Sequence, residues 1–525
     1  MEEQVLQQPM TQAVPQTQAY KPEIKSFDRI FVFLSVVAGY LFIRFSVFSF
    51  NGFFTTASVL LTFACCAVYV IKCGHKPTSA QWFLGAVICA FAFTYSITAS
   101  PLLHVLCTLF LIPAVFWWVQ AVCIRASFVT KFFPFDLART VFVQPMRDFF
   151  GFFRALASGK NGAPSKKRTF LPIMIGLIAT IPLTVAVALL LATADEGMDK
   201  MLGQMIDSIL TPLTYGDLLL TMRQLFWTLP AAMVIFGMLR ADAKNKLYPL
   251  PSDMFYHEKL SRCKAINNLC IYAGFTPICL LYLLYVISQA NYFLSAFAGK
   301  VPGNMLYSEY ARRGFFELCV IAVINLCVIL FMLTFSRKSG SESTPVLKVY
   351  TCIICGFTLF IISTAVAKML LYIDKYGLTR LRLYTTWFML LLAAVFIVLA
   401  VRVFIKRLPT ARIITAVFIV MFGTLCFSKP DALITEYNIK MYLSGEHEEL
   451  DTRTLSIMSD DAYLAALRCV DAGLFDSSDM GNAEFYKERI VSMCSDAVDN
   501  YKDDPMCSLS FTAQELSALY ESRFA

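Results

Sequence analysis

Charged residues that lead directly into an apolar segment are the first candidates for chemistry in this chain. Glu309, Arg313 and Glu317 are spaced four residues apart, so a helix would place them on one face as a ladder of alternating charge. The residues that follow, to position 335, are almost all apolar. Charges at the edge of hydrocarbon are costly unless they are paired, hydrated or functional. Asn325, about two turns after Glu317, predicts a hydrogen bond to a neighbouring helix or, alternatively, a substrate contact.

Four of the charged side chains inside predicted membrane spans lie near the same, outer face of the membrane. Arg44 and Lys368 lie near the ends of their spans, and Arg223 and Glu317 near the starts. One interpretation is an outward-facing, water-filled vestibule that binds an ion, a lipid headgroup or a small anion. The other is a set of separate side chains that reach the interface one by one, as long Lys and Arg side chains do. The residues predicted to bind a ligand are Glu317, Arg313, Glu309, Arg223, Arg44, Lys368 and Asn325.

Sequence signatures of catalytic and metal sites are absent. Neither His-Glu pair, at 257–258 and 447–448, is followed by the second histidine of a zinc-protease helix, and no Gly-x-Ser-x-Gly or Gly-x-Gly-x-x-Gly segment occurs. Cys352 and Cys355 form one Cys-x-x-Cys pair, without a second pair or a nearby histidine. We therefore predict no catalytic residue, no metal and no cofactor. A membrane enzyme that acts on lipid-linked substrates, with Glu317 as a base, is a further alternative.

The distribution of apolar residues predicts an all-α polytopic membrane protein. The chain is 58% hydrophobic, with a mean hydropathy of +0.62. The apolar residues come in runs of about 20, the length at which a helix crosses about 30 Å of hydrocarbon. We predict a transmembrane helical bundle of about eleven spans, with the limits 29–48, 53–73, 82–99, 101–123, 169–193, 217–239, 268–290, 315–335, 349–373, 383–404 and 412–428.

The segments outside the spans divide the chain into three predicted parts. Residues 1–26 are rich in Gln, Pro and Thr and are predicted to be a disordered leader, without a cleavable signal peptide. Residues 27–428 form the transmembrane domain. Its long loop at 124–168 mixes Phe with Arg and Lys, which is typical of an amphipathic segment lying on lipid headgroups. Residues 429–525, called the tail below, are predicted to form a small soluble helical domain.

The tail differs from the rest of the chain in charge and in helix signals. It carries 8 Lys and Arg against 19 Asp and Glu, a net charge of −11, whereas the remainder has a net charge of +19. Four short helices are expected. Asp431 is expected to cap the first, Ser459 the second, which ends at Gly473, and Thr512 with Glu515 forms a capping box for the last. An acidic helical tail favours a protein partner at 429–525 and argues against nucleic acid.

Basic residues in the loops predict the orientation of the chain. With the N-terminus in the cytoplasm, the cytoplasmic segments carry 27 Lys and Arg and the external loops carry 7. This asymmetry follows the positive-inside rule. An odd number of spans then places the tail outside the membrane, so the predicted side of the tail depends on the span count.

Three segments resemble a family of bacterial membrane proteins. They are YSEYARRGFFEL at 307–318 followed by Asn325, YGLTRLRLYTTWFM at 376–389, and PDALITEYNIKMYLSG at 430–445. Together they resemble the multispanning family known as domain of unknown function 4173, close to 4153, over roughly residues 30–480. The resemblance implies a protein of the bacterial cytoplasmic membrane. It supplies no activity, substrate or catalytic residue, and residues 481–525 resemble no family.

Two functions from different classes are consistent with these features. The first is transport of a solute or ion, or binding of a lipid or solute, through the outer polar vestibule. The second is a non-enzymatic sensor or assembly factor that acts through the tail, with the spans as an anchor. Membrane lipids are expected partners in both. The absence of visible internal repeats weakens the case for a transporter.

Overall fold

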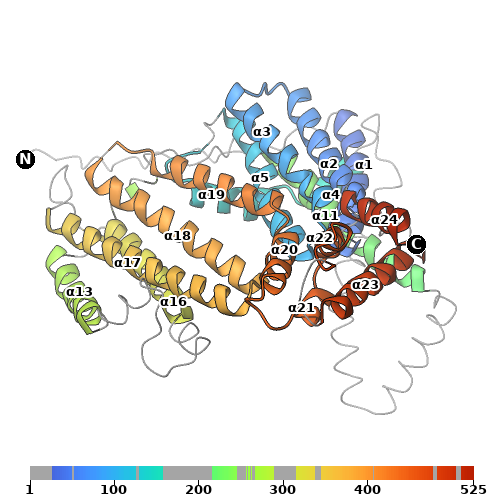
Figure 1. Ribbon diagram of the computed structural model, residues 1–525. Helices are drawn as coiled ribbons and strands as arrows, with labels where there is room; N and C mark the ends of the chain where they lie inside the picture. Colours follow the sequence, from blue (N-terminus) through green and yellow to red (C-terminus); the bar gives the residue numbers. More distant parts are fainter. Residues whose placement is uncertain are drawn as a thin grey trace, which may run out of the picture.

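The computed structural model describes residues 26–49, 52–125, 129–157, 216–244, 256, 258–259, 262, 267–288, 315–336, 345–405, 407–476, 482–503 and 510–524. The regular elements in these ranges are helices, which confirms the predicted all-α class. Figure 1 shows three bodies of helices. The first contains the N-terminal spans, the second contains the later spans, and the third is formed by the tail.

Nine helices in the described ranges are long and apolar enough to cross a membrane. Their limits are Phe27–Phe48, Gly52–Lys72, Ser79–Ile97, Pro101–Ile124, Leu220–Ala243, Asn268–Ser288, Pro345–Tyr376, Arg380–Phe404 and Thr410–Phe427. Each coincides with one of the predicted spans, so the chain is a multi-pass membrane protein. A tenth predicted span is the helix α16 (Phe315–Phe335), and the span predicted at 169–193 lies outside the described residues. The predicted total of eleven spans, an odd number, therefore stays a prediction.

The first group packs the N-terminal helices around α11 (Gly216–Lys244). It comprises α1 (Ser26–Phe42) with the π-helix η1 (Ile43–Ser49), α2 (Gly52–Lys72), α3 (Ser79–Ala92), α4 (Thr94–Ile97) and α5 (Pro101–Ile124). A Cβ atom on Gly39 would lie 3.1 Å from the backbone nitrogen of Ala232. Glycine at this position therefore lets α1 and α11 approach closely, as small residues do in membrane bundles.

The second group is built on the long helix α17 (Pro345–Tyr376), which contacts α13 (Asn268–Ser288), α16 and α18 (Arg380–Phe404). The ring of Tyr282 stacks on Phe357 with 3.9 Å between centroids. Helix α19 (Thr410–Phe427) returns beside α18 and contacts α4, so α18 and α19 join the two groups. Trp387 and Phe422 of these helices pack against the core of the first group.

The tail helices form their own hydrophobic core. They are α20 (Pro430–Leu443), α21 (Thr452–Ser456), α22 (Asp460–Asp471), α23 (Ala483–Asp503) and α24 (Phe511–Arg523). Tyr442, Leu467, Cys494 and Leu516 are fully buried and come from four of these helices. Figure 1 places this body, in red, at one end of the spans. We call this the tail side. The opposite ends of the spans, marked by Ile124, Phe404 and Thr410, form the far side.

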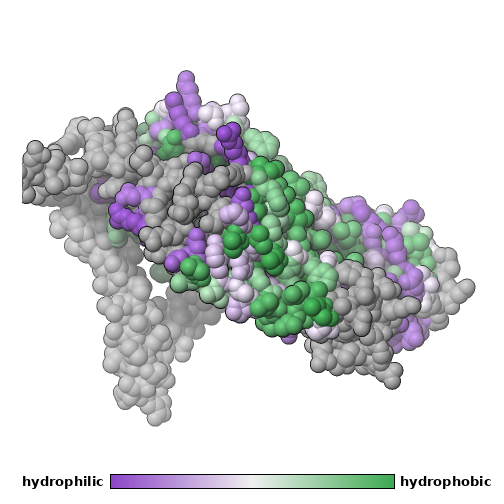
Figure 2. All heavy atoms as spheres, turned by 90° about the vertical axis from the view of Figure 1, so that its left-hand side faces the viewer, coloured by the Kyte–Doolittle hydropathy of each residue, from purple (hydrophilic) through white to green (hydrophobic). Residues whose placement is uncertain are grey.

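The outer surface of the spans is apolar. Large side chains of α13, including Leu281 and Leu284, are each 63% exposed. Figure 2 shows a band of apolar side chains crossing this face of the molecule between polar regions at its two ends. An apolar surface this extensive is unfavourable in water and is normal for helices that face lipid.

Candidate functional site

The predicted residues Arg44 and Arg223 lie on helices that contact each other, η1 and α11. Arg44 donates a hydrogen bond to the hydroxyl of Tyr40 at 2.9 Å. The guanidinium carbon of Arg223 lies 4.4 Å from the centre of the Phe48 ring, which is a cation–π contact. The structure therefore brings this predicted pair to the same region of the first helix group.

Glu317, Lys368 and Asn325 lie in the second helix group instead. Glu317 is exposed in the first turn of α16. Lys368 is only 3% exposed, and α17 continues to Tyr376, so the residue is farther from the helix end than expected. Asn325 is fully buried. It accepts a hydrogen bond from the Tyr282 hydroxyl and donates one to Thr358 at 2.9 Å, as one of its two interpretations predicts.

The described members of the predicted vestibule are divided between the two helix groups. Arg44 and Arg223 belong to the first helix group, whereas Glu317 and Lys368 belong to α16 and α17 of the second. Glu309 and Arg313 lie outside the described residues. The vestibule therefore remains a prediction.

The tail is held on the spans by a buried carboxylate, Asp431. It accepts two hydrogen bonds from the Arg380 guanidinium, at 2.8 and 2.6 Å, and one from the Ser459 hydroxyl at 2.6 Å. Burial favours the neutral acid, but the hydrogen bonds from Arg380 and Ser459 outweigh burial and keep the pKa of Asp431 below its ordinary value. Asp431 lies inside the first turn of α20, so the prediction that it caps this helix is wrong.

A second buried carboxylate, Asp461, joins the tail to the loop between α4 and α5. It accepts hydrogen bonds from the Thr98 hydroxyl at 2.6 Å, the Ala99 backbone at 2.7 Å and the Thr512 hydroxyl at 2.7 Å. The ammonium of Lys429 lies 3.4 Å from the same carboxylate. Four hydrogen-bond donors from three parts of the chain therefore meet at one side chain.

Two segments that carry the family resemblance meet at this junction. Asn438 of α20 donates to the Leu378 carbonyl at 2.9 Å and accepts from the Leu378 backbone nitrogen at 2.7 Å. With the pair of Arg380 and Asp431, this contact joins segment 376–389 to segment 430–445. The sequence similarity in these segments thus coincides with a tertiary contact.

The loop predicted to be amphipathic has its polar residues on the inside. The segment contains α6 (Phe133–Phe142), α7 (Gln144–Arg147) and α8 (Gly151–Ala157). From α6 to the residue that follows α7, four polar side chains recur every four residues and are at most 7% exposed. We call them the polar stripe: Asp136, Thr140, Gln144 and Asp148. Apolar side chains of the same segment point outward, with Phe135 63% and Phe142 73% exposed.

Two members of the polar stripe, Asp148 and Gln144, contact side chains of other helices. Asp148 forms ion pairs with Arg154 and with Arg240, whose side-chain nitrogen lies 3.2 Å away on α11. The amides of Gln144 and Gln120 meet at 2.9 Å. A Cβ atom on Gly237 would lie 2.6 Å from the carbonyl oxygen of Pro145. Glycine is therefore required at position 237 for α11 and α7 to approach closely.

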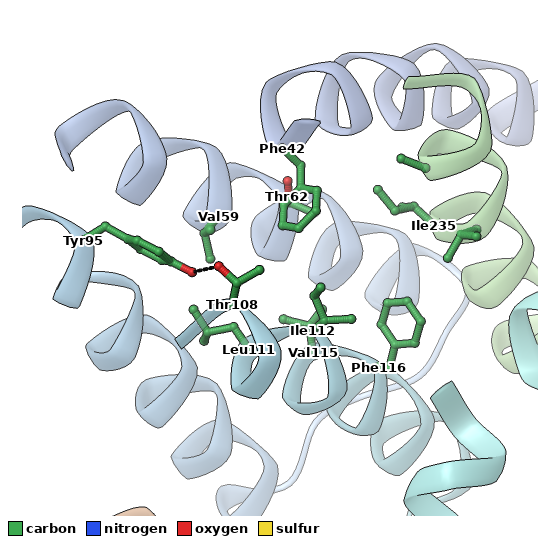
Figure 3. A pocket seen from close by; sticks show the side chains of 12 residues that line it. Phe42, Val59, Thr62, Tyr95, Thr108, Leu111, Ile112, Val115, Phe116 and Ile235 are labelled. Atoms are coloured by element: carbon green, nitrogen blue, oxygen red, sulfur yellow. Dashed lines mark hydrogen bonds between the residues drawn. The ribbon is translucent and has the colours of Figure 1, made fainter. Parts of the chain in front are cut away.

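Two cavities lie between the described spans, and both have apolar walls. The smaller has a volume of about 150 Å³ and lies among α1, α2, α4, α5 and α11. In the wall of this cavity, the hydroxyls of Tyr95 and Thr108 hydrogen-bond to each other at 2.7 Å (Figure 3). Because these hydroxyls satisfy one another, the cavity suits hydrocarbon better than a hydrated ion.

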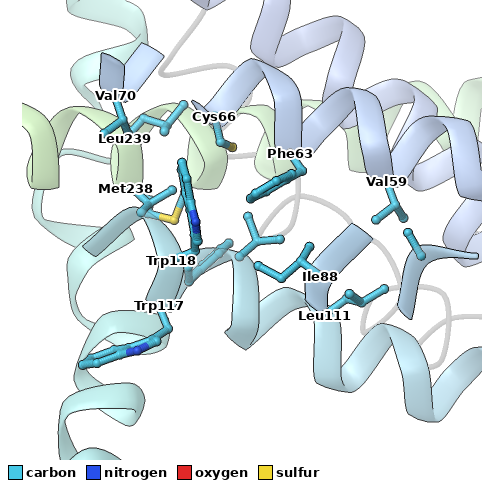
Figure 4. Packing of buried hydrophobic residues seen from close by; sticks show 14 of the residues in the cluster. Val59, Phe63, Cys66, Val70, Ile88, Leu111, Trp117, Trp118, Met238 and Leu239 are labelled. Atoms are coloured by element: carbon cyan, nitrogen blue, oxygen red, sulfur yellow. The ribbon is translucent and has the colours of Figure 1, made fainter. Parts of the chain in front are cut away.

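The larger cavity is a groove of about 560 Å³ where the first helix group meets α18 and α19. Its walls come from α3, α5, α6, α18 and α19, and include Leu106, Trp117, Phe133, Leu391, Ile414 and Phe418. Trp117 is also part of the buried core of the first group, with Trp118 and Met238 close by in Figure 4. One wall of the groove is therefore rigidly supported.

No group of three or more His, Cys, Asp or Glu side chains that could hold a metal occurs in the described ranges. The buried carboxylates Asp431, Asp461 and Asp148 are each engaged by cationic or hydroxyl groups. The groove and the polar stripe were not predicted. The four-residue spacing from Asp136 to Asp148 was a visible signal for the stripe.

Comparison with known proteins identifies the family and goes no further. No curated protein and no solved structure matches the chain. The model of the family described as Domain of unknown function (DUF4153) matches residues 85–469, which include α5, α11, α16 to α20 and most of the wall of the groove. This is one of the two related families indicated by the sequence segments. The match extends over more than half of the chain, so this multi-pass membrane protein belongs to the DUF4153 family.

Proposed function

We propose that the protein binds a membrane lipid, with one acyl chain in the groove between α5 and α6 on one side and α18 and α19 on the other. The observation that carries this proposal is the apolar groove of about 560 Å³ within the spans. This is within the range of about 300–1,000 Å³ that is typical of ligand sites. We also propose that the chain is similar to the related family 4173 and that it resides in the bacterial cytoplasmic membrane.

The length of the groove supports an acyl chain as the occupant. Along α5 its wall extends from Leu106 to Trp117, eleven steps of the helix. At 1.5 Å per residue this is about 16 Å. One leaflet contributes about 15 Å of hydrocarbon. The groove therefore has the depth of a single leaflet.

The walls of the groove explain why we favour lipid binding over ion transport. A hydrated ion needs polar ligands along its path, whereas Leu391, Phe418 and Ile414 offer hydrocarbon. The charges that suggested a vestibule are divided between the two helix groups in the described part of the chain. A lipid chain requires neither a polar path nor an energy source.

The experiment is photocrosslinking in lipid nanodiscs. The probes are phosphatidylcholine and phosphatidylglycerol, each with a diazirine in one acyl chain, and the labelled peptides are mapped by mass spectrometry. We expect labelling of peptides from α5 and α19. Ala114→Phe places a ring in the groove and is expected to remove this labelling. The matched control is Val105→Phe on the same helix, at a side chain that is 43% exposed and outside the groove.

The control makes the outcome decisive. Equal labelling of the wild type and the Ala114→Phe variant would show that the probe reacts from the surrounding lipid, and the proposal would fail. Loss of labelling in both phenylalanine variants would indicate a general packing defect. In that case Thr415→Phe, which fills the groove from α19, provides the deciding measurement.

A second candidate function is supported by the surface of the tail. A polar depression of about 450 Å³ is lined by Arg468, Asp471, Glu515 and Ser522 of α22 and α24. Phe485 on α23 is 62% exposed. These features suit a protein partner, as expected for a sensor or assembly factor. If the tail binds such a partner, Phe485→Ser would weaken its capture without changing lipid labelling.

The proposed orientation places the N-terminus in the cytoplasm and the tail outside. The charges that support it are the basic residues of the loops on the far side. A reporter active only outside the cell, fused after Ala525, tests this placement. An inactive external reporter with an active internal one would place the tail in the cytoplasm.

A further inference from the structure

Basic residues surround the far end of the groove. Lys131, just before α6, and Arg139, on α6, lie within two residues of the groove-lining side chains Phe133 and Leu137. Arg412 lies two residues before Ile414, which lines the opposite wall. Both walls therefore end in cationic residues at the same face of the membrane.

The turn between α18 and α19 adds further positive charge. Arg402 donates a hydrogen bond to Thr410 at 2.5 Å, which joins the last turn of α18 to the first residue of α19. Arg407 and Arg412 are exposed on this turn. The sequence from 402 to 415 contains no Asp or Glu. This end of the groove thus carries several positive charges without an acid from the same turn.

The acid on the α6 side does not oppose these charges at the surface. Asp136 is 3% exposed and accepts hydrogen bonds from Thr130 at 2.6 Å and Tyr256 at 2.5 Å. Its carboxylate belongs to the polar stripe and faces the protein. The rim of the groove is therefore cationic next to an apolar interior.

From this arrangement we infer that the groove binds an anionic glycerophospholipid, with its phosphate at Arg407, Arg412 and Lys131 and one acyl chain between Trp117 and Phe418. The inference rests on the proposed function and adds the class of the headgroup. Transfer of a chain from bilayer into an apolar groove gains little, because both environments are hydrocarbon. The charge at the rim must then provide the selection.

The alternative headgroup is zwitterionic, as in phosphatidylcholine. Such a lipid would bring a quaternary ammonium close to the same arginines and gain less from them. Each Lys or Arg near the surface favours an anionic lipid by about fivefold. Two arginines are therefore enough to produce a measurable preference.

The test measures the ratio of phosphatidylglycerol to phosphatidylcholine labelling, using the same two photoactivatable lipids in nanodiscs of mixed composition. The wild type is expected to prefer phosphatidylglycerol. In the double variant Arg407→Gln with Arg412→Gln, the preference for phosphatidylglycerol should fall by about fivefold for each arginine removed, with phosphatidylcholine labelling unchanged. The matched control is Lys72→Gln with Lys76→Gln, two exposed lysines at the far end of α2 and away from the groove.

Each outcome has one meaning. An unchanged preference in the arginine variant, or an equal fall in the lysine control, overturns the anionic site and leaves chain binding intact. If Ala114→Phe loses both labels while the arginine variant keeps its preference, chain binding in the groove stands and the anionic headgroup site fails. A preference that also weakens with rising salt agrees with an ionic contact at the surface.

Discussion

Asp431 and Arg380 form a two-point ion pair in which the carboxylate is fully buried and the guanidinium is 29% exposed. The pair connects the first helix of the tail to the first residue of α18. Its asymmetry in burial matters, because an unpaired buried charge is far more costly than an unpaired charge that reaches water.

Removal of the exposed partner should therefore be the more damaging change. Arg380→Ala leaves Asp431 buried with the hydrogen bond from Ser459 and is expected to destabilise by about 3 kcal/mol, at the lower end for a broken buried pair. Asp431→Asn leaves a partly hydrated arginine and should be milder. Thermal unfolding in nanodiscs measures both. Lys440→Ala, in an exposed pair with Glu436, is the control and should change stability by less than about 0.5 kcal/mol.

The pH dependence of stability provides a separate test of the same pair. The pKa of Asp431 is below its ordinary value, so its ionised form stabilises the fold at pH values above about 4. This contribution is lost as the pH falls through the lower pKa of the folded state. Unfolding midpoints measured from pH 7 to 3 should fall more steeply for the wild type than for Asp431→Asn. Parallel curves would contradict the assignment.

The ion pair of Asp148 and Arg240 should also be sensitive to the removal of one partner. Arg240 is 1% exposed, so Asp148→Asn leaves a buried cation and should destabilise by about 3–5 kcal/mol. The double variant Asp148→Leu with Arg240→Met should recover much of this loss. Chemical denaturation in detergent checks both. Glu258→Gln, in the exposed pair with Arg262, is expected to be neutral.

Asn325 offers a choice between structural and substrate roles. Asn325→Leu removes hydrogen bonds to Tyr282 and Thr358 and is expected to cost about 1 kcal/mol, as for interhelical bonds in membranes. Lipid labelling should not change. Cys327→Leu, at an exposed position two residues later, should leave stability unchanged. A loss of labelling without a loss of stability would favour the substrate role.

The outward apolar face of α6 should contact lipid. Phe142→Cys, at a side chain that is 73% exposed, is expected to react slowly with a membrane-impermeant maleimide when the exposed native cysteines are replaced. Lys76→Cys, in the loop between α2 and α3 on the far side, should react quickly. Equal rates would show that α6 lies in water.

The spans could be predicted because each depends on a property of a single segment. A run of about 20 apolar residues must be a helix in hydrocarbon, where no water satisfies the backbone. Nine predicted spans match the described spans for this reason. Similarly, Gly473 has a φ of +68° and follows the last turn of α22, as the predicted helix end requires.

Contacts between segments could not be predicted in the same way. Thr512 and Glu515 were expected to form a capping box, but Ser510 caps α24 by accepting a hydrogen bond from Ala513 at 3.1 Å. The Thr512 hydroxyl instead contacts Asp461. In the spans, side chains are apolar on all sides, so the sequence gives the depth of Glu317 but not the helix that it faces.

The polar stripe imposes an order on how the chain is made. Residues 133–157 leave the ribosome before α11. Arg240 of α11 donates a hydrogen bond to the carbonyl of Gly151, which precedes it by 89 residues. Until α11 has been synthesised, Asp148 has no arginine from that helix and its carboxylate would face hydrocarbon if the segment entered the bilayer. Residues 133–157 can therefore complete their packing against α11 only after that later helix has been synthesised. Folding of this part of the protein then runs against the direction of synthesis.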